Sequence, residues 1–374
     1  MAPPTTETQH RRQYLSVLTR LGPSLGLIAV WTLFALLKGG SFANWNNQRL
    51  MLLQTTVVAT AATGATLVIA SGGIDLSVGS AIAMGTMIIA FLLKQGVAPG
   101  PAAILAIAAG GGVGLVIGTM IIGRIGRVVG AIVGAGIGYA CWQPAGPWVA
   151  FAVGSSTALI LAYLVDRLLG KIELSPFIVT LAMWGGLRGI AKGIGNNQPI
   201  YPDQTWLTDL MQPSSRWLSL APGVLIAIVL TIVMSLILRY TRFGRYIYGI
   251  GSNEQTARLC GVHVERTKLL IYGLASMCTA IAALLQFSFL YGQGDPTTAD
   301  GYELKVIASV VIGGASLTGG EGTILGTVFG ALIMTVVDNG CTKLGLNNWV
   351  QEIVTGAIIL AAVSLDQLRH RRSE

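Results

Sequence analysis

The residue types that point to chemistry gather in a short basic segment, residues 239–268, between two long apolar stretches. The acids there are Glu254 and Glu265, and the more numerous cations are Arg239, Arg242, Arg245, Arg258, Arg266 and Lys268. Ser252 followed by Gln255 is a capping-box pattern, which predicts that a short helix starts there. Gly261 is well placed to end it. The segment therefore predicts a basic, helix-bearing loop between membrane spans, suited to contacting a soluble partner.

A second candidate is an acid at membrane depth. The sequence SGGIDLSVGS at residues 71–80 interrupts an apolar stretch, and Asp75 lies within it. A carboxylate is costly there unless it is paired or hydrated, so Asp75 is a candidate functional residue. The structural alternative is that Asp75 caps the next helix, whose N-terminal dipole favours an anion. The two interpretations are compatible, and direct contact with a solute is a third.

A similar break occurs late in the chain, where residues 313–322 read GGASLTGGEG. The apolar run before it, about residues 304–317, is short for a full span. Paired interruptions in two halves are typical of transporters with discontinuous helices, although glycine-rich packing alone gives a similar pattern. Gly72, Gly73, Asp75 and Ser77, with Gly319 and Gly320, are therefore candidates for helix breaks along or beside a translocation path.

Sequence motifs for catalysis are not found. The chain has no GxxxxGK[ST] phosphate loop, no HExxH and no GxSxG. Its four cysteines are scattered without CxxC spacing, and its three histidines lie in polar segments, so a histidine metal site in the membrane is not expected. If transport is driven by ATP, the ATPase must be another chain. We expect no enzyme activity, metal or cofactor in this chain.

The elements that position these residues follow from composition. The chain has 374 residues, of which 53% are hydrophobic and only 11% charged. This is too little charge to cover a soluble domain of this length, and apolar runs of about 18 residues or more recur, so we expect an all-α polytopic membrane protein. The net charge of +8 is explained by cations on the cytoplasmic face and does not require nucleic acid.

About twelve hydrophobic segments are expected. They lie near residues 23–38, 50–70, 81–93, 102–122, 128–142, 148–168, 175–192, 218–238, 269–290, 304–317, 323–337 and 348–365. With the N-terminus inside, alternation places four cation-rich breaks on the cytoplasmic side, which agrees with the positive-inside bias. Arg188 and Lys192 count against this topology, and we expect them to lie within the protein and not in lipid.

Glycines spaced by four occur twice, at Gly110, Gly114 and Gly118 and again at Gly126, Gly130, Gly134 and Gly138. Such a strip lets two helices approach closely. General packing among the spans is favoured over a specific dimer interface. On the expected outer loop, Asn196, Asn197, Gln198 and Asp203 are solvated residues or contacts for a polar solute or a docking protein, the first being favoured.

Four ordered motifs resemble a known family. TLVIASGGIDLSVGS at residues 66–80 is similar to the signature of permease subunits of ribose/xylose/galactose-type bacterial ABC importers. SPFIVTL at residues 175–181 and VIGGASLTGGEGTILGT at residues 311–327 resemble two further motifs of that family. Residues 244–262 resemble its cytoplasmic coupling loop, with matches at Gly244, Arg245, Gly251, Asn253, Glu254, Ala257, Gly261 and neighbouring positions.

The resemblance implies a permease in the bacterial inner membrane that imports a monosaccharide by alternating access. Its implied partners are an ABC ATPase that binds ATP and magnesium, a periplasmic sugar-binding protein and a second permease subunit. The helix from about Asn253 to Cys260 is expected to rest in a groove of the ATPase. The family indicates no sugar-contacting residues, and the sugar and the choice between homodimer and heterodimer stay open.

One departure from the resemblance concerns the organisation of the chain. Residues 126–171 intervene where relatives run almost directly on to the SPFIVTL motif. We therefore expect about ten family-type spans plus an inserted two-helix hairpin. The hairpin is interpreted as a permease–permease contact, a site for an extra subunit, or a peripheral element. The expected regions are a cytoplasmic tail at 1–22, a permease domain at 23–366 with the coupling loop at 239–268, and a cytoplasmic tail at 367–374.

Two rival functions make different demands on the sequence. An ion-coupled secondary transporter is expected to use several buried acids or basic residues, and Asp75 is the only clear early one. It also has no need for a basic loop helix. A membrane scaffold assembled through glycine-spaced helices is a second rival, and a nucleoside-type ABC permease is an alternative within the favoured class. The sequence favours the sugar importer over these.

Overall fold

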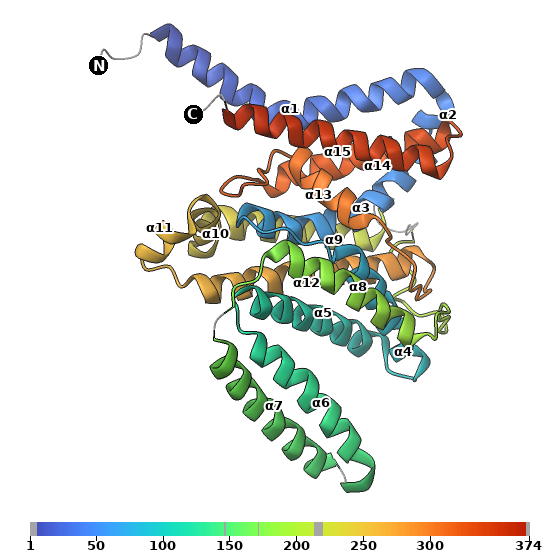
Figure 1. The fold of residues 1–374 in the computed structure, drawn as a ribbon. Coiled ribbons are helices and arrows are strands. Elements are labelled where there is room, and N and C mark those ends of the chain that lie inside the picture. The colour runs from blue at the N-terminus through green and yellow to red at the C-terminus, as the bar shows by residue number, and fades with distance from the viewer. Residues whose placement is uncertain (1–5, 146, 171, 213–219, 372–374) are drawn as a thin grey trace.

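The computed structural model describes residues 6–145, 147–170, 172–212 and 220–371. Over these ranges the chain forms fifteen α-helices, shown in Figure 1. They are α1 (Thr6–Lys38), α2 (Gly40–Ala43), α3 (Trp45–Ala70), α4 (Val78–Lys94), α5 (Pro99–Ile121), α6 (Ile125–Ala145), α7 (Pro147–Leu169), α8 (Pro176–Ile194), α9 (Pro222–Tyr240), α10 (Arg242–Ser252), α11 (Glu254–Leu259), α12 (Val264–Phe289), α13 (Tyr302–Ile312), α14 (Ile324–Lys343) and α15 (Asn348–Arg371).

The expected hydrophobic segments each correspond to a helix, so the all-α polytopic fold is confirmed. Among the described residues, seven helices are long and apolar enough to cross a membrane, and four shorter apolar helices accompany them. Helices suit this environment because they satisfy their backbone polar groups internally. Both terminal helices run beyond the expected spans: residues 6–22 are continuous with the first span, and α15 continues to Arg371.

The centre of the bundle is made by α3 and α12, which pack against each other. The most apolar stretch of α3 is 83% buried and that of α12 is 72% buried. Polar side chains in α3 are satisfied locally, because the hydroxyls of Thr60, Thr63 and Thr66 donate to the carbonyls four residues earlier. These two helices therefore form a rigid axis around which the others are placed.

The first glycine strip explains how α5 joins this axis. A Cβ at Gly110 would lie 3.1 Å from the Ser276 carbonyl oxygen, and one at Gly118 would lie 3.2 Å from the Cα of Leu269. A side chain at Gly114 would collide with the Tyr272 carbonyl. The strip therefore packs against α12 inside the chain, which confirms general packing among the spans.

One helix begins in the interior of the bundle, and another is too short to cross it. Helix α4 starts after the break at residues 71–77, and Val78 is buried at its first position. Helix α13 has only 11 residues and so spans about 16 Å, roughly half of a hydrocarbon core. The two glycine-rich sequence motifs thus correspond to discontinuous helices.

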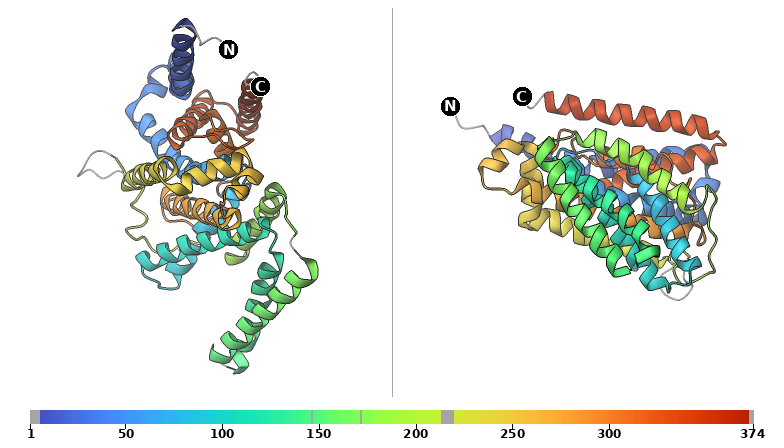
Figure 2. Two further views of the ribbon diagram at one scale, coloured as in Figure 1. Left: turned by 90° about the vertical axis from the view of Figure 1, so that its left-hand side faces the viewer. Right: turned by 60° about the horizontal axis from the view of Figure 1, so that its bottom comes forward.

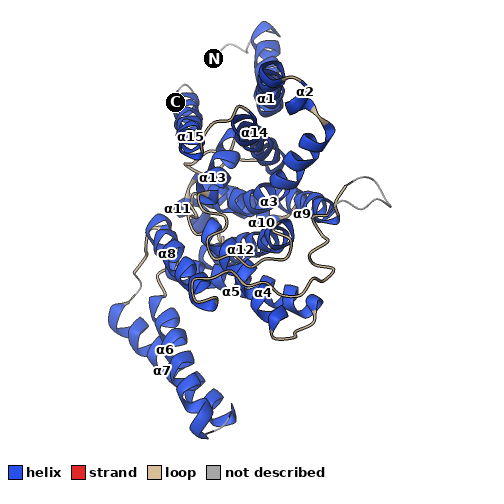
Figure 3. Ribbon diagram, turned by 90° about the vertical axis from the view of Figure 1, so that its right-hand side faces the viewer, coloured by secondary structure: helices blue, strands red, loops and turns tan. Residues whose placement is uncertain are grey.

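Helices α6 and α7 form a hairpin that projects from the bundle, as Figures 1 and 3 show from two sides. The second glycine strip packs within it, because Gly130 and Gly134 of α6 lie against Ala158 of α7. Only 6% of the apolar stretch of α7 is buried. Its outward side chains include Phe151, Leu159 and Leu168, each at least 72% exposed.

The short helices α10 and α11 cap one end of the bundle. In Figures 1 and 2 they lie at the same end as the first and last described residues. The opposite end carries the turns between α4 and α5 and between α14 and α15. Both termini therefore share a side of the molecule with the basic segment, as the expected topology requires.

Candidate functional site

The basic segment folds into α10 and α11, each fixed by a cap. The Thr241 hydroxyl accepts a hydrogen bond from the Gly244 N–H, 3.2 Å, at the start of α10. The Asn253 side chain accepts one from the Thr256 N–H, 2.8 Å, at the start of α11. The expected cap at Ser252 is wrong by one residue: Ser252 ends α10 and belongs to its last turn, so Asn253 takes the capping role.

Gly261 ends α11, as its position predicted. Its φ of +83° lies in the left-handed region, where glycine has no Cβ penalty. The Gly261 N–H donates to the Arg258 carbonyl, 3.1 Å, and the Val262 N–H donates to the Ala257 carbonyl, 3.1 Å. These bonds satisfy the last carbonyls of α11 and turn the chain sharply into α12.

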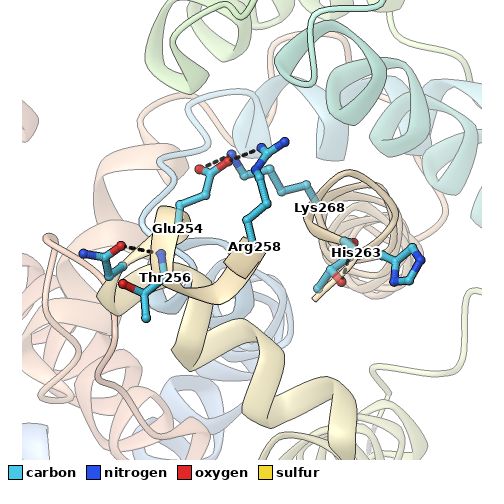
Figure 4. A network of polar contacts seen from close by, with 7 residues as sticks. Glu254, Thr256, Arg258, His263 and Lys268 are labelled. Carbon is cyan, nitrogen blue, oxygen red and sulfur yellow. Dashed lines mark hydrogen bonds and ion pairs between the residues drawn. The ribbon is translucent and has the colours of Figure 1, made fainter. Parts of the chain in front are cut away.

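An ionic network joins α11 to α12, as Figure 4 shows. Glu254 Oε2 lies 2.7 Å from Lys268 Nζ, and Glu254 Oε1 lies 3.2 Å from Arg258 Nη2. Burial raises the pKa of Glu254, but the hydrogen bonds and charges of Lys268 and Arg258 outweigh it, so the net pKa lies below the usual glutamate value. Glu254 therefore stays ionised and holds α11 in a fixed orientation.

The remaining predicted residues of this segment divide into buried and exposed positions. Gly244 and Ala257 are buried, and Ala257 packs with Ile250 and Val264, so they shape the segment from inside. Arg245, Asn253 and Gly261 are exposed. Sequence reasoning missed Leu259, an apolar side chain that is 88% exposed at the tip of α11. An isolated leucine at the end of a polar helix was the available signal.

The two glycine-rich breaks meet at α10. The Gly320 N–H donates to the Ala70 carbonyl, 2.9 Å, which joins the end of α3 to the loop before α14. A Cβ at Gly319 would lie 2.9 Å from the Cα of Gly72 and 2.8 Å from the carbonyl oxygen of Gly251, the penultimate residue of α10. We call Gly72, Gly251, Gly319 and Gly320 the glycine junction. The sequence predicted the two breaks and the loop separately, and their meeting was not predicted.

Backbone contacts in the glycine junction leave no room for a side chain at Gly251 or Gly319. Gly72, Gly319 and Gly320 also have positive φ, between +80° and +87°, which only glycine adopts easily. Beside it, the Tyr248 hydroxyl of α10 donates to the Gly322 carbonyl, 2.6 Å. A displacement of α10 must therefore move the ends of both discontinuous regions, because close-packed backbone transmits displacement directly.

Asp75 is buried, with 6% of its surface exposed. Its Oδ1 accepts hydrogen bonds from the Ser77 N–H, 2.8 Å, and the Ser77 hydroxyl, 2.6 Å. The capping interpretation needs a correction, because the N-cap of α4 is Ser77 and Asp75 holds the turn two residues before it. Gly73 lies against the Tyr272 hydroxyl of α12, where a Cβ would collide. These residues fix the path of the break against the central axis.

The two cations expected inside the protein behave differently. Arg188 of α8 donates through Nη1 to the Pro296 and Thr298 carbonyls, 3.0 and 2.7 Å, which confirms its expected place. The expectation for Lys192 is wrong, because its side chain is exposed near the end of α8. Asn196 and Asn197 adopt positive φ in the turn after α8, where asparagine is tolerated, so this turn is a structural helix end.

Metal-ligating side chains do not gather in the described part of the chain, where no group of three or more His, Cys, Asp or Glu residues is placed to hold an ion. The site consists of two discontinuous membrane helices connected to an exposed, ionically braced helical loop. It defines a polytopic membrane protein with a basic helical loop at one end of the bundle.

Comparison with known proteins identifies the family. Residues 125–363 match the family described as "Branched-chain amino acid transport system / permease component". The ribose import permease protein RbsC of Escherichia coli is 33% identical over 366 residues, covering 97% of this chain and 98% of that protein. The chain belongs to this permease family.

Two further relatives extend the comparison. The ribose import permease protein RbsC of Bacillus subtilis is 32% identical over 359 residues, covering 96% of each chain. The L-arabinose transport system permease protein AraH of Escherichia coli is 33% identical over 225 residues, covering 60% of this chain and 67% of that protein. No solved structure matches the chain with significance.

Proposed function

We propose that this chain is the membrane-spanning permease subunit of an ATP-binding cassette importer for a monosaccharide, a pentose or a hexose. The near full-length similarity to ribose permeases supports the substrate class. ATP and magnesium are bound by a partner ATPase, sugar arrives from a periplasmic binding protein, and a second permease subunit completes the path. The chain lies in the bacterial inner membrane with both termini in the cytoplasm.

The glycine junction carries the mechanism. Helices α10 and α11 dock on the ATPase, with Arg245, Asn253, Glu254 and Leu259 at the contact and Gly244, Gly251, Ala257 and Gly261 shaping it. ATP-driven closure of the ATPase displaces α10. Because α10 touches both breaks, the displacement reaches α4 and α14 together and re-orients them around the path. Such coupling requires that the ATPase bind the two states with different affinity.

Co-purification of the chain with its candidate ATPase tests the docking surface. Leu259→Asp places a charge at the exposed tip of α11 without touching the core, and it is expected to abolish co-purification. Leu346→Asp is the matched control, since this exposed leucine lies in the α14–α15 turn at the opposite end of the bundle. If both variants retain the ATPase equally, α11 is not the docking element.

Glu254→Ala and Gly261→Pro test the orientation of α11. Glu254→Ala removes the brace to Lys268, and Gly261→Pro replaces a left-handed residue by one with φ near −65°. Both are expected to weaken ATPase binding or to uncouple hydrolysis from uptake. ATPase binding and coupled uptake equal to wild type in both variants would contradict the coupling role.

Uptake into proteoliposomes tests the class of transporter. The complex is given ATP and radiolabelled ribose, arabinose, a nucleoside or leucine, and ionophores are added in parallel. ATP-dependent monosaccharide uptake that persists with ionophores is expected. Loss of uptake with ionophores in the presence of ATP would favour the ion-coupled alternative, and leucine uptake without sugar uptake would favour the amino-acid class that the family description mentions.

A further inference from the structure

The N-terminal ends of α4 and α13 meet inside the bundle. A side chain added at Gly79, the second residue of α4, would collide with the Ala299 carbonyl and with Glu303 Oε2, in the first turn of α13. Ser80 is fully buried, and Ala299 is 6% exposed. The first turns of α4 and α13 therefore pack against each other.

The turn at residues 295–301, which leads into α13, is held from two other helices. Arg188 of α8 donates to the carbonyls of Pro296 and Thr298. Gln286 of α12 donates through Nε2 to the Thr298 hydroxyl, 2.9 Å. Arg188 of α8 and Gln286 of α12 thus bring polar side chains to this turn, beside the first turns of α4 and α13.

Each of these helices also presents a buried polar atom that has no hydrogen-bond partner among the described residues. The atoms are Ser80 Oγ, Arg188 Nη2, Gln286 Oε1 and Glu303 Oε2. Arg188 Nη2 lies 3.9 Å from Asp300 Oδ1, which is an ion pair but too long for a hydrogen bond. Arg188 and Gln286 hold this turn, and Ser80 and Glu303 lie at the adjoining starts of α4 and α13. Buried polar atoms in native proteins are nearly always hydrogen-bonded, so the four unpartnered atoms indicate a missing ligand.

The donors and acceptors match a polyhydroxyl compound. Arg188 Nη2 donates, Gln286 Oε1 accepts, a carboxyl oxygen of Glu303 can accept, and the Ser80 hydroxyl does both. Sugar hydroxyls also do both, so a neutral sugar can satisfy all four atoms. The positive charge of Arg188 is already opposed by the carboxylate of Asp300, which reduces the attraction for the carboxylate of an amino acid. Asp300 is 79% exposed on its side chain and marks the open edge of the cluster.

We propose that Ser80, Arg188, Gln286 and Glu303 form the site at which this permease holds a neutral monosaccharide during translocation. This assignment rests on the proposed import function and deepens it. Ser80 and Glu303 lie in the first turns of α4 and α13, and Arg188 and Gln286 contact the turn that leads into α13. The first break leads into α4, the second break follows α13, and both breaks contact α10. Movement of α10 therefore changes the site.

The test uses the fact that Ser80 Oγ has no protein partner. Ser80→Ala removes an unpartnered hydroxyl, so the thermal unfolding temperature of the permease stays unchanged or rises. The measured quantity is the number of sugar molecules transported per ATP hydrolysed, in proteoliposomes with the ATPase and saturating binding protein. Radiolabelled ribose and arabinose are first tested with wild type, and the variants are then compared with the sugar that wild type transports. Ser80→Ala is expected to lower this ratio by about tenfold, the effect of one lost hydrogen bond to bound solute. Gln286→Met, the second variant, is expected to lower it at least as much.

Ser309→Ala is the matched control, because Ser309 is equally buried but its hydroxyl already donates to the Lys305 carbonyl. It is expected to leave the ratio within about twofold of wild type. A normal ratio in both Ser80→Ala and Gln286→Met would overturn the site while leaving sugar import intact. A wild-type complex that carries leucine and neither sugar would instead overturn the import function itself, and with it the polyhydroxyl assignment.

Discussion

The bundle and the α6–α7 hairpin use the same sequence pattern in different surroundings. In the bundle, Gly110, Gly114 and Gly118 bring α5 against α12, a helix that is itself enclosed by α3 and α4. In the hairpin, Gly130 and Gly134 bring α6 against α7, whose other faces are exposed. The comparison teaches that glycine spacing determines how closely two helices approach. It does not determine how strongly the stability of the whole bundle depends on their contact.

The largest expected effect comes from closing the glycine strip in the bundle. Gly114→Val drives a side chain into the backbone of α12, with an expected loss of about 3 kcal/mol and loss of monodisperse protein. Gly130→Val makes the same change in the hairpin and is expected to leave unfolding of the bundle unchanged. Thermal unfolding and size-exclusion chromatography in detergent check both. Equal destabilisation by the two variants would show that the hairpin is an integral part of the bundle.

Ion pairs give the next comparison. Lys305 Nζ of α13 lies 2.6 Å from Asp338 Oδ2 of α14, and the side chains are 28% and 24% exposed. Lys305→Met leaves Asp338 without its cation and is expected to cost about 2–3 kcal/mol, less than for a fully buried pair. In the hairpin, Arg127 and Asp166 are 3.8 Å apart, and the Arg127 side chain is 54% exposed.

Arg127→Met is therefore expected to cost less than about 1 kcal/mol. Midpoints of unfolding for the two variants give the comparison, and Lys305→Met with Asp338→Leu is expected to recover part of the loss. A larger effect in the hairpin than in the bundle would reverse the ranking.

The brace between α11 and α12 is expected to have a smaller effect. Glu254 and Lys268 are 36% and 20% exposed on their side chains, so a double-mutant cycle with Glu254→Gln and Lys268→Met is expected to give about 0.5–1 kcal/mol. Because the pKa of Glu254 is lowered on folding, this contribution is present above the usual value of 4.5 and is lost as the pH falls through the lower, folded value. The coupling free energy between Glu254 and Lys268 should be the same at pH 6 and pH 8. A clear change between the two pH values would contradict an ionised Glu254 over this range.

The smallest effect is expected from removing the hairpin. The Ile172 N–H donates to the Gly123 carbonyl, 3.3 Å, so the two ends of the hairpin meet. Replacing residues 125–170 with a short Gly/Ser linker keeps Arg124, which pairs with Glu265 at 3.2 Å. The unfolding temperature is expected to change by less than about 3 °C.

Oligomeric state and uptake by the shortened chain decide among the roles left for the hairpin. Loss of the second permease subunit would assign it to that contact, and loss of a further co-purifying subunit would assign it to that partner. Normal assembly and uptake would make it peripheral.

Much of the fold follows from local features of the sequence. Apolar runs predicted the membrane helices, because the apolar length needed to cross a bilayer is a property of each segment alone. Gly261 predicted the end of α11, because the ability to adopt a positive φ without strain is a property of glycine itself. The start of α11 was off by one residue because Ser252 and Asn253 are both good caps, and packing of α10 chose between them.

Asp75 and Lys192 show where local inference ends. The break around Asp75 was predicted, but the exact hydrogen bonds were not, because Ser77 offers both a backbone and a hydroxyl donor. Lys192 shares a helix face with Arg188 by spacing, yet only Arg188 reaches the turn at residues 295–301. Which of two cations finds carbonyl partners depends on a segment more than a hundred residues away.

By itself, the sequence determined that this is an all-α membrane protein with two helix breaks, closely packed glycine strips and a basic helical loop. Each of these depends on residues within a few turns of one another. Only the tertiary structure decided that Gly72, Gly251 and Gly320 meet, that each glycine strip pairs with a particular helix, and that Arg188, Gln286 and the first turn of α4 meet at residues 295–301. These contacts join residues far apart in the chain, and their free energy is decided by packing and by the need to partner buried polar atoms.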